Sequence, residues 1–172
     1  MNWKHALPII LLAPALALAQ SKPSDPQIAG IVVTANQIDI DAGKLAKSRS
    51  QNKEVKDFAQ QMITDHTAVN KQAAALAKKL GVKPEQSDTS KSLKQGASEN
   101  LANLKQLKDG RFDKAYVDHE VAYHQQVLDA IDKVLVPSAQ NQELKDLIVK
   151  VRPAIATHLE HAKHVQADLG KK

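Results

Sequence analysis

Apolar residues recur at three- and four-residue steps along four long segments of this chain, and this periodicity constrains the fold more than any other feature. The expected helices cover residues 25–47, 53–80, 111–136 and 141–169. Asp25 is expected to cap the first helix, Gly81 to end the second and Pro137 to stop the third. No segment shows the strict alternation of a half-buried strand. The sequence therefore predicts an all-α protein.

The connection between the second and third helices is much longer than the other two. A weaker helical pattern over residues 93–107, before a break at Asp109 and Gly110, predicts a short accessory helix there. Pro153 is expected to kink the last helix or to break it near Val151. Four long amphipathic helices with short, long and short connections are typical of a ferritin-like four-helix bundle with a crossover.

The first residues have the organisation of a secretory signal peptide. An apolar stretch over residues 6–18 follows a basic start, and Ala17-Leu18-Ala19 matches a small-x-small cleavage site. The stretch is too short and too interrupted by proline for a membrane span of roughly 20 residues. We expect a signal peptide over 1–19, a flexible leader over 20–26 and the bundle over 27–172, the alternative being an uncleaved anchor. After cleavage the protein would have no membrane span and would lie in the periplasm or outside the cell.

Composition and motifs exclude several classes of function. The chain has no cysteine, which rules out disulfides, thiolate metal sites and thiol nucleophiles. Its net charge is +5, but the lysines are scattered singly or in pairs among acidic residues, so nucleic-acid binding is not expected. There is no glycine-rich phosphate loop, Gly-x-Ser-x-Gly elbow or His-Glu-x-x-His motif. The sequence thus favours a non-enzymatic protein.

Each expected long helix turns at least one ionisable side chain toward the interior. On a helical wheel with about 100° per residue, the apolar arcs contain His66, Glu120, His124 and His158, and Asp39 lies at the flank of the first arc. Heights measured from the connecting turns, at about 1.5 Å per residue, place these side chains near mid-bundle. Buried ionisable groups need partners, so we expect the five to interact.

Two interpretations of this cluster remain open. The five inward residues offer mixed ligands for a divalent transition metal such as zinc, iron, manganese or copper. Alternatively, they satisfy one another by hydrogen bonding, with Tyr116 and Tyr123 as further partners. The two Glu-x-x-His motifs of di-iron bundles are missing, because Glu120 is followed by Tyr123 before His124. A dinuclear oxidase site is therefore not expected.

The remaining histidines of the helices are expected at the periphery. His119 and His161 lie at the edges of their arcs, and His164 lies outside its arc. The spacing of His158, His161 and His164 would also allow a chelate on the surface of the last helix, but exposed side chains near a helix C-terminus are the favoured interpretation. Asp65 is interpreted as a residue that orients an imidazole or as a plain surface charge.

Three stretches of the sequence resemble one known family. They are residues 58–66 (Phe-Ala-Gln-Gln-Met-Ile-Thr-Asp-His), residues 112–116 (Phe-Asp-Lys-Ala-Tyr) with His124, and Pro153 with His158-Leu159. In combination they are similar to the exported bacterial proteins grouped as domain of unknown function 4142, often described as outer-membrane proteins. The similarity covers nearly all of residues 27–169. It implies export and a ferritin-like bundle, with no established activity.

Two hypotheses on function follow. The three motif histidines of this family, His66, His124 and His158, are the ones that the wheel turns inward, while Asp39 stands where the family often has glutamate. The chain is then an exported bundle that binds a transition metal in envelope stress or metal handling, with about one ion per chain. Alternatively, it is a structural module that holds no metal and binds another protein of the cell envelope.

Overall fold

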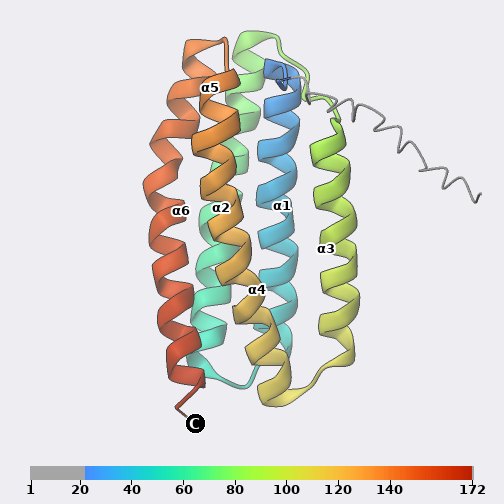
Figure 1. Ribbon diagram of the computed structural model, residues 1–172, viewed down its shortest axis with the longest axis vertical. Helices are drawn as coiled ribbons and strands as arrows, with labels where there is room; N and C mark the ends of the chain where they lie inside the picture. Colours follow the sequence, from blue (N-terminus) through green and yellow to red (C-terminus); the bar gives the residue numbers. More distant parts are fainter. Residues whose placement is uncertain (1–21, 172) are drawn as a thin grey trace, which may run out of the picture.

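The computed structural model describes residues 22–171 as a bundle of helices (Figure 1). The elements are α1 (Asp25–Arg49), α2 (Lys53–Leu80), α3 (Asp88–Gln106), α4 (Asp109–Ala130), the π-helical turn η1 (Ile131–Leu135), α5 (Val136–Ser138) and α6 (Gln142–Leu169). No strand occurs between residues 22 and 171, and the all-α prediction is confirmed.

The four long helices form two antiparallel hairpins. A short turn joins α1 to α2, and another joins the end of α5 to α6, which runs back along α4 (Figure 1). The long connection between the hairpins contains α3, which packs mainly against α1 at the side of the bundle. The ferritin-like bundle with a crossover is confirmed. The accessory helix has 19 residues and is longer than its weak pattern predicted, because Ser87 starts it with a capping box.

The beginning of α1 differs from the prediction. Ser24, not Asp25, caps the helix, since its side chain accepts the backbone N–H of Gln27. The Asp25 carboxylate instead accepts the backbone N–H groups of Gln140 and Asn141, both at 2.9 Å. Asp25 therefore ties the start of α1 to the turn before α6.

The breaks expected near glycine and proline are also displaced. Asp109 and Gly110 are the first residues of α4 and do not end a helix. Helical backbone continues through Pro137 to Ser138, after the hydrogen-bond pattern changes to that of a π-helix in η1. Likewise α6 runs through Pro153 unbroken. The proline has no N–H to donate to the carbonyl four residues earlier, which belongs to Val149. Val149 is 50% exposed, so water can bind to that carbonyl instead.

The core consists of two apolar clusters with a polar layer between them. One cluster includes Phe58, Phe112 and Ala162, and the other includes Ile31, Leu128 and Ile155, with further members from these and neighbouring elements. Along α1 and α4 the ionisable residues lie between members of the two clusters, and on α6 His158 lies beside Leu159 of the second cluster and before Ala162 of the first. Close-packed apolar side chains therefore separate this polar layer from both ends of the bundle.

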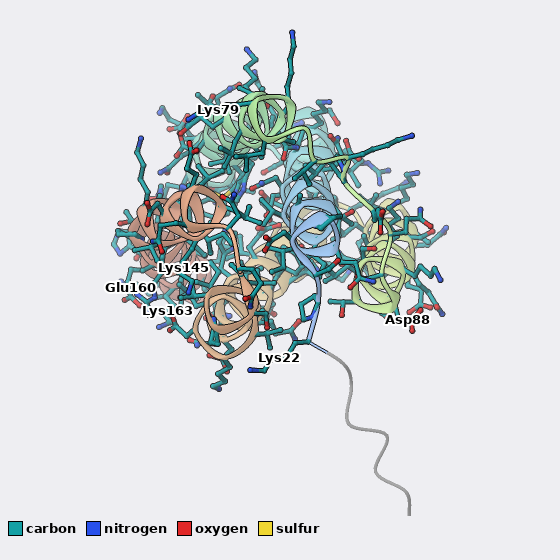
Figure 2. All side chains as sticks on the ribbon, turned by 90° about the horizontal axis from the view of Figure 1, so that it is seen from above. Lys22, Lys79, Asp88, Lys145, Glu160 and Lys163 are labelled. Carbon is teal, nitrogen blue, oxygen red and sulfur yellow. The ribbon has the colours of Figure 1, made fainter. Side chains whose placement is uncertain are left out.

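Charged side chains cover the outside of the bundle. Lys79, Lys145 and Lys163 lie at its periphery when it is viewed from above (Figure 2). Within residues 22–171, no helix is both long and apolar enough to cross a membrane. The predicted signal peptide and the first part of the leader lie outside the described residues, so both stay predictions.

Candidate metal centre

All five ionisable side chains that the sequence turns inward are buried at one level of the bundle. Asp39 belongs to α1, His66 to α2, Glu120 and His124 to α4, and His158 to α6. None of the five is more than 2% exposed. The prediction that they face the interior together is therefore confirmed, and their role as ligands stays a prediction.

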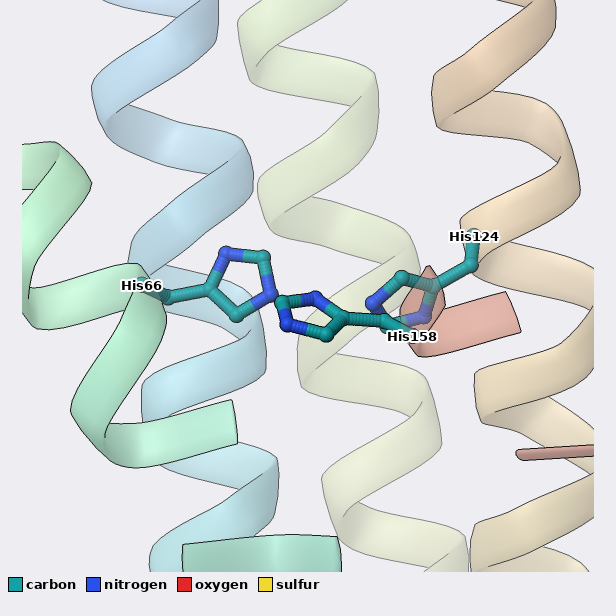
Figure 3. Close-up of side chains that lie close together, drawn as sticks. All are labelled: His66, His124 and His158. Carbon is teal, nitrogen blue, oxygen red and sulfur yellow. The ribbon is translucent and has the colours of Figure 1, made fainter. Parts of the chain in front are cut away.

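Three of these side chains are imidazoles that converge from three helices (Figure 3). Their ring centroids are 5.7 Å apart for His66 and His124, 5.2 Å for His66 and His158, and 5.5 Å for His124 and His158. We call them the three-histidine cluster. Because each ring comes from a different helix, the packing of α2, α4 and α6 fixes the triangle.

The triangle is close to the size that a bound metal ion requires. One ring nitrogen of each histidine lies within 4.8 Å of the other two. A central point is then at most about 2.8 Å from each nitrogen, while zinc binds imidazole at about 2.0–2.1 Å. Each nitrogen needs to move by no more than about 0.7 Å to reach that distance. Side-chain rotation alone can supply such a movement.

One nitrogen of His66 is held by an amide. Its Nδ1 lies 2.7 Å from Asn36 Oδ1. The Asn36 amide is itself oriented, since its Nδ2 donates to the Val32 carbonyl at 3.0 Å. The amide oxygen therefore faces the ring, and His66 Nδ1 carries the proton and donates. This leaves the Nε2 lone pair of His66 directed away from Asn36.

The other two rings are held in the same manner. His124 Nδ1 donates to the backbone carbonyl of Glu120 at 2.9 Å, and His158 Nε2 donates to the Asp65 carboxylate at 2.9 Å. Asp65 therefore orients an imidazole, as one of its two interpretations predicts. Hydrogen bonds of this kind fix the tautomer of metal-binding histidines in proteins.

The second nitrogen of each ring has no hydrogen-bond partner. His66 Nε2, His124 Nε2 and His158 Nδ1 are all buried and unpaired. A buried acceptor without a partner costs roughly 1–3 kcal/mol, so three in one place require an explanation. A metal ion that binds all three lone pairs would supply it.

The environment keeps these imidazoles neutral. Burial, followed by the neighbouring His124 and His158, lowers the pKa of His66 to about 2. Burial also lowers the pKa of His124 to about 4, although the Glu120 carbonyl partly opposes this, and it lowers the pKa of His158 despite the Asp65 carboxylate. The three imidazoles are therefore neutral near neutral pH. Neutral imidazole is the form that binds metal.

A pair of carboxyl groups adjoins the three-histidine cluster. Asp39 and Glu120 are close enough for their charges to interact, and Asp39 Oδ2 lies 3.5 Å from His66 Nε2. Burial raises the pKa of Glu120 to about 8, and burial together with Glu120 raises that of Asp39 well above its ordinary value. One ligand atom from each carboxyl group and one from His124 lie within 4.8 Å of one another. The pair is therefore largely protonated near neutral pH in the metal-free protein, and it can release its protons when a cation binds.

The tyrosines do not complete a hydrogen-bonded network around these groups. The Tyr123 hydroxyl donates to the Ala35 carbonyl at 3.3 Å, and the Tyr116 hydroxyl is buried without a partner. Oδ1 of Asp39 and both carboxyl oxygens of Glu120 likewise have no donor assigned to them. A purely structural network predicts the opposite, namely that such atoms pair with one another.

The other histidines lie outside the cluster. His161 pairs with Gln61 at 2.8 Å and contacts the Phe58 ring edge-on, and the His164 side chain is 73% exposed beside Asp168. His158 directs its partnered nitrogen outward, toward Asp65, so these residues do not form a chelate on the surface of α6. His119 lies at the edge of the polar layer, with its side chain 26% exposed.

Asn36 is the functional residue that sequence reasoning missed. It is 5% exposed and lies one helical turn before Asp39, on the same face of α1. A polar residue at that spacing is a signal that a helical wheel can detect. A search restricted to ionisable residues passes over it, because an amide orients a ligand without being one.

Comparison with known proteins assigns this chain to a family. Residues 12–165 match the sequence model of the domain of unknown function DUF4142. The chain belongs to the DUF4142 family. No curated protein matches the sequence. Among solved structures, the fold is similar to that of CopM in the Cu(II)-bound form, with a TM-score of 0.66 and 15% identity over 86% of this chain and 98% of that one. At this identity the similarity shows a shared helical fold.

Proposed function

We propose that this DUF4142 protein binds one divalent transition metal ion at His66, His124 and His158. The observation that carries the proposal is the arrangement of the three rings. Each has one nitrogen fixed by an acceptor and the other buried and unpaired. Three neutral imidazoles with oriented lone pairs form a typical transition-metal ligand set.

Copper(II) is the ion that we expect to bind most tightly. Imidazole suits copper, zinc, iron and nickel, whereas manganese prefers oxygen ligands, and copper(II) stands highest in the general order of affinities. The solved structure of CopM, with a similar fold, is described as Cu(II)-bound, which supports the same choice. Zinc is the second candidate, because its tetrahedral geometry accepts three imidazoles and one further ligand.

The carboxyl pair would compensate the charge of the ion. A divalent cation in a water-excluded layer requires nearby anions, and Asp39 and Glu120 are the two buried carboxyl groups beside the histidines. We propose Asp39 as an additional ligand, because its Oδ2 already lies 3.5 Å from the free nitrogen of His66. Glu120 then serves as the second carboxyl group beside the ion. We further propose export through the signal peptide and a role in metal handling outside the cytoplasm.

Metal loading tests this function. Mature, untagged protein is mixed with Cu²⁺ or Zn²⁺ and passed over a desalting column, and metal and protein are quantified. We expect about one ion per chain and a higher melting temperature, since an ion at 100 times its Kd adds about 2.7 kcal/mol to the free energy of unfolding. His164→Ala, which removes an exposed histidine, is the matched control. Wild-type protein that retains neither ion would contradict the proposal and support the structural-module alternative.

A further inference from the structure

A groove with a mixed polar and apolar lining opens between α3 and α4, beside the polar layer. It has a volume of about 410 Å³. Leu93, Gly96 and Ala97 of α3 form one wall, and His119, Tyr123 and Gln126 of α4 form the other. A Cβ atom added at Gly96 would contact nothing within 4 Å, so small residues in the middle of α3 keep the groove wide.

His119 connects this groove with the carboxyl pair. The side chain is 26% exposed and lines the groove, while its Nδ1 is buried and has no hydrogen-bond partner. That nitrogen lies 3.9 Å from Oε1 of Glu120, which is also unpaired. A single imidazole thus extends from an open groove to a carboxyl group that adjoins the three-histidine cluster.

The position of His119 is fixed by its neighbour. The ring stacks on Tyr123 with centroids 5.6 Å apart and planes 14° apart. Tyr123 is anchored in turn by the hydrogen bond from its hydroxyl to the Ala35 carbonyl. The imidazole is therefore held in the α4 wall of the groove, so a ligand role for it needs little reorganisation.

The other approaches among the described residues are less suited to an ion. A cavity of about 60 Å³ reaches Asn36, but its remaining lining is apolar, and a cation gains no ligand there to replace its water. On the side of α2, the hydrogen bond between Asp65 and His158 closes the approach to the cluster. The α3–α4 groove combines open volume with ligand atoms on the way inward.

We propose that the α3–α4 groove is the access route of the divalent metal ion, with His119 as its first protein ligand and Glu120 as the second. The inference rests on the proposed metal site and adds a transient binding site to it. A hydrated ion would exchange water for the His119 imidazole in the wall of the groove and then for Glu120, which gives up its proton to the solvent as it binds the ion. It reaches the three histidines without being fully stripped of ligands at any stage.

Rates of metal uptake test the route. Metal-free protein is mixed with Cu²⁺ in a stopped-flow instrument, and quenching of tyrosine fluorescence follows the arrival of the ion near Tyr116 and Tyr123. We expect His119→Ala to slow uptake at least tenfold while the final metal content stays at one ion per chain. Gly96→Leu, which narrows the groove from the opposite wall, should also slow it. His164→Ala should load at the wild-type rate.

The outcomes separate the route from the site. If His119→Ala and Gly96→Leu load as fast as the wild-type protein, the route is wrong while the three-histidine site stands. If His119→Ala loads at the normal rate but binds the ion more weakly, His119 belongs to the resident site and the access role is contradicted. Wild-type protein without any uptake would instead contradict the metal site itself.

Discussion

Alanine at His124 is expected to weaken the binding of Cu²⁺ by at least 100-fold, which corresponds to about 2.7 kcal/mol. His124 supplies one of the three free ring nitrogens, and two imidazoles hold an ion far less tightly than three. Equilibrium competition with a chelator of known affinity measures the change. His66→Ala and His158→Ala should have losses of the same order, because the rings are equivalent members of one triangle.

Removal of a residue that only orients a ring should have a smaller effect. Mutation of such residues typically lowers metal affinity 10–100-fold. We therefore expect Asp65→Ala, which frees His158 Nε2, to fall in that range. Asp65 is a surface residue with a side chain 41% exposed, so this variant should fold even if a buried histidine variant does not. Equal affinities for wild-type protein, Asp65→Ala and His158→Ala would contradict the assignment of His158 as a ligand.

The metal-free protein is expected to lose stability as the pH rises from 6.5 to 8. In the unfolded chain Glu120 ionises near its ordinary pKa, but in the folded protein burial holds that pKa at about 8. The folded state therefore binds more protons in this window, and its free energy of unfolding falls by up to about 1.4 kcal/mol per pH unit and proton. The histidines offset part of the loss near pH 6.5, where half of their protons are still bound in the unfolded chain, and little of it above pH 7.5. Their lowered pKa values stabilise the folded state fully well above pH 6.5 and less as the pH falls toward and below it.

Glu120→Gln is the variant that isolates this effect. Urea unfolding in the presence of a chelator should show a loss of about 2 kcal/mol between pH 6.5 and 8 for the wild-type protein. The variant should lose less than about half of that, with the buried Asp39 carboxyl group responsible for the remainder. Glu160→Gln, at an exposed position, serves as the control and should behave like wild type. A wild-type stability that stays constant or rises over this window would contradict a buried, protonated carboxyl pair.

Much of the bundle could be predicted because its helices are amphipathic throughout. The spacing of Val55, Phe58 and Met62 identifies the buried face of α2, and the same face contains His66. The helix ends were harder to predict, because tertiary contacts decide them. Asp25 has the composition of an N-cap, yet it is used to hold the turn before α6. Pro153 looks like a helix breaker, yet the bond that it removes lies on an exposed side of α6.

The candidate site could likewise be predicted only in part. A helical wheel and the axial rise per residue bring Asp39, His66, Glu120, His124 and His158 to one level, since both depend only on regular helix geometry. They cannot show which nitrogen of a ring is held and which is free. That depends on partners from other helices or from the backbone, such as Asn36 for His66 and the Glu120 carbonyl for His124.

The position of α3 in the bundle could not be predicted from the periodicity of its apolar residues either. Its middle section, around Gly96 and Ala97, contributes little to the core and leaves open space on α4. Sequence periodicity assigns His119 to the edge of an arc, which is correct for its exposure but does not reveal the groove above it. The combination of an open groove with a fixed imidazole requires the positions of two helices that are not hairpin partners.

X-ray absorption spectroscopy at the copper edge, on protein loaded with one equivalent of Cu²⁺, tests the central claim most directly, because it counts the imidazoles bound to the ion. The account predicts three imidazole nitrogens in the first shell of the wild-type protein and two in His124→Ala, at the same copper content in the sample. A first shell of oxygen ligands, or an imidazole signal that His124→Ala leaves unchanged, would contradict it.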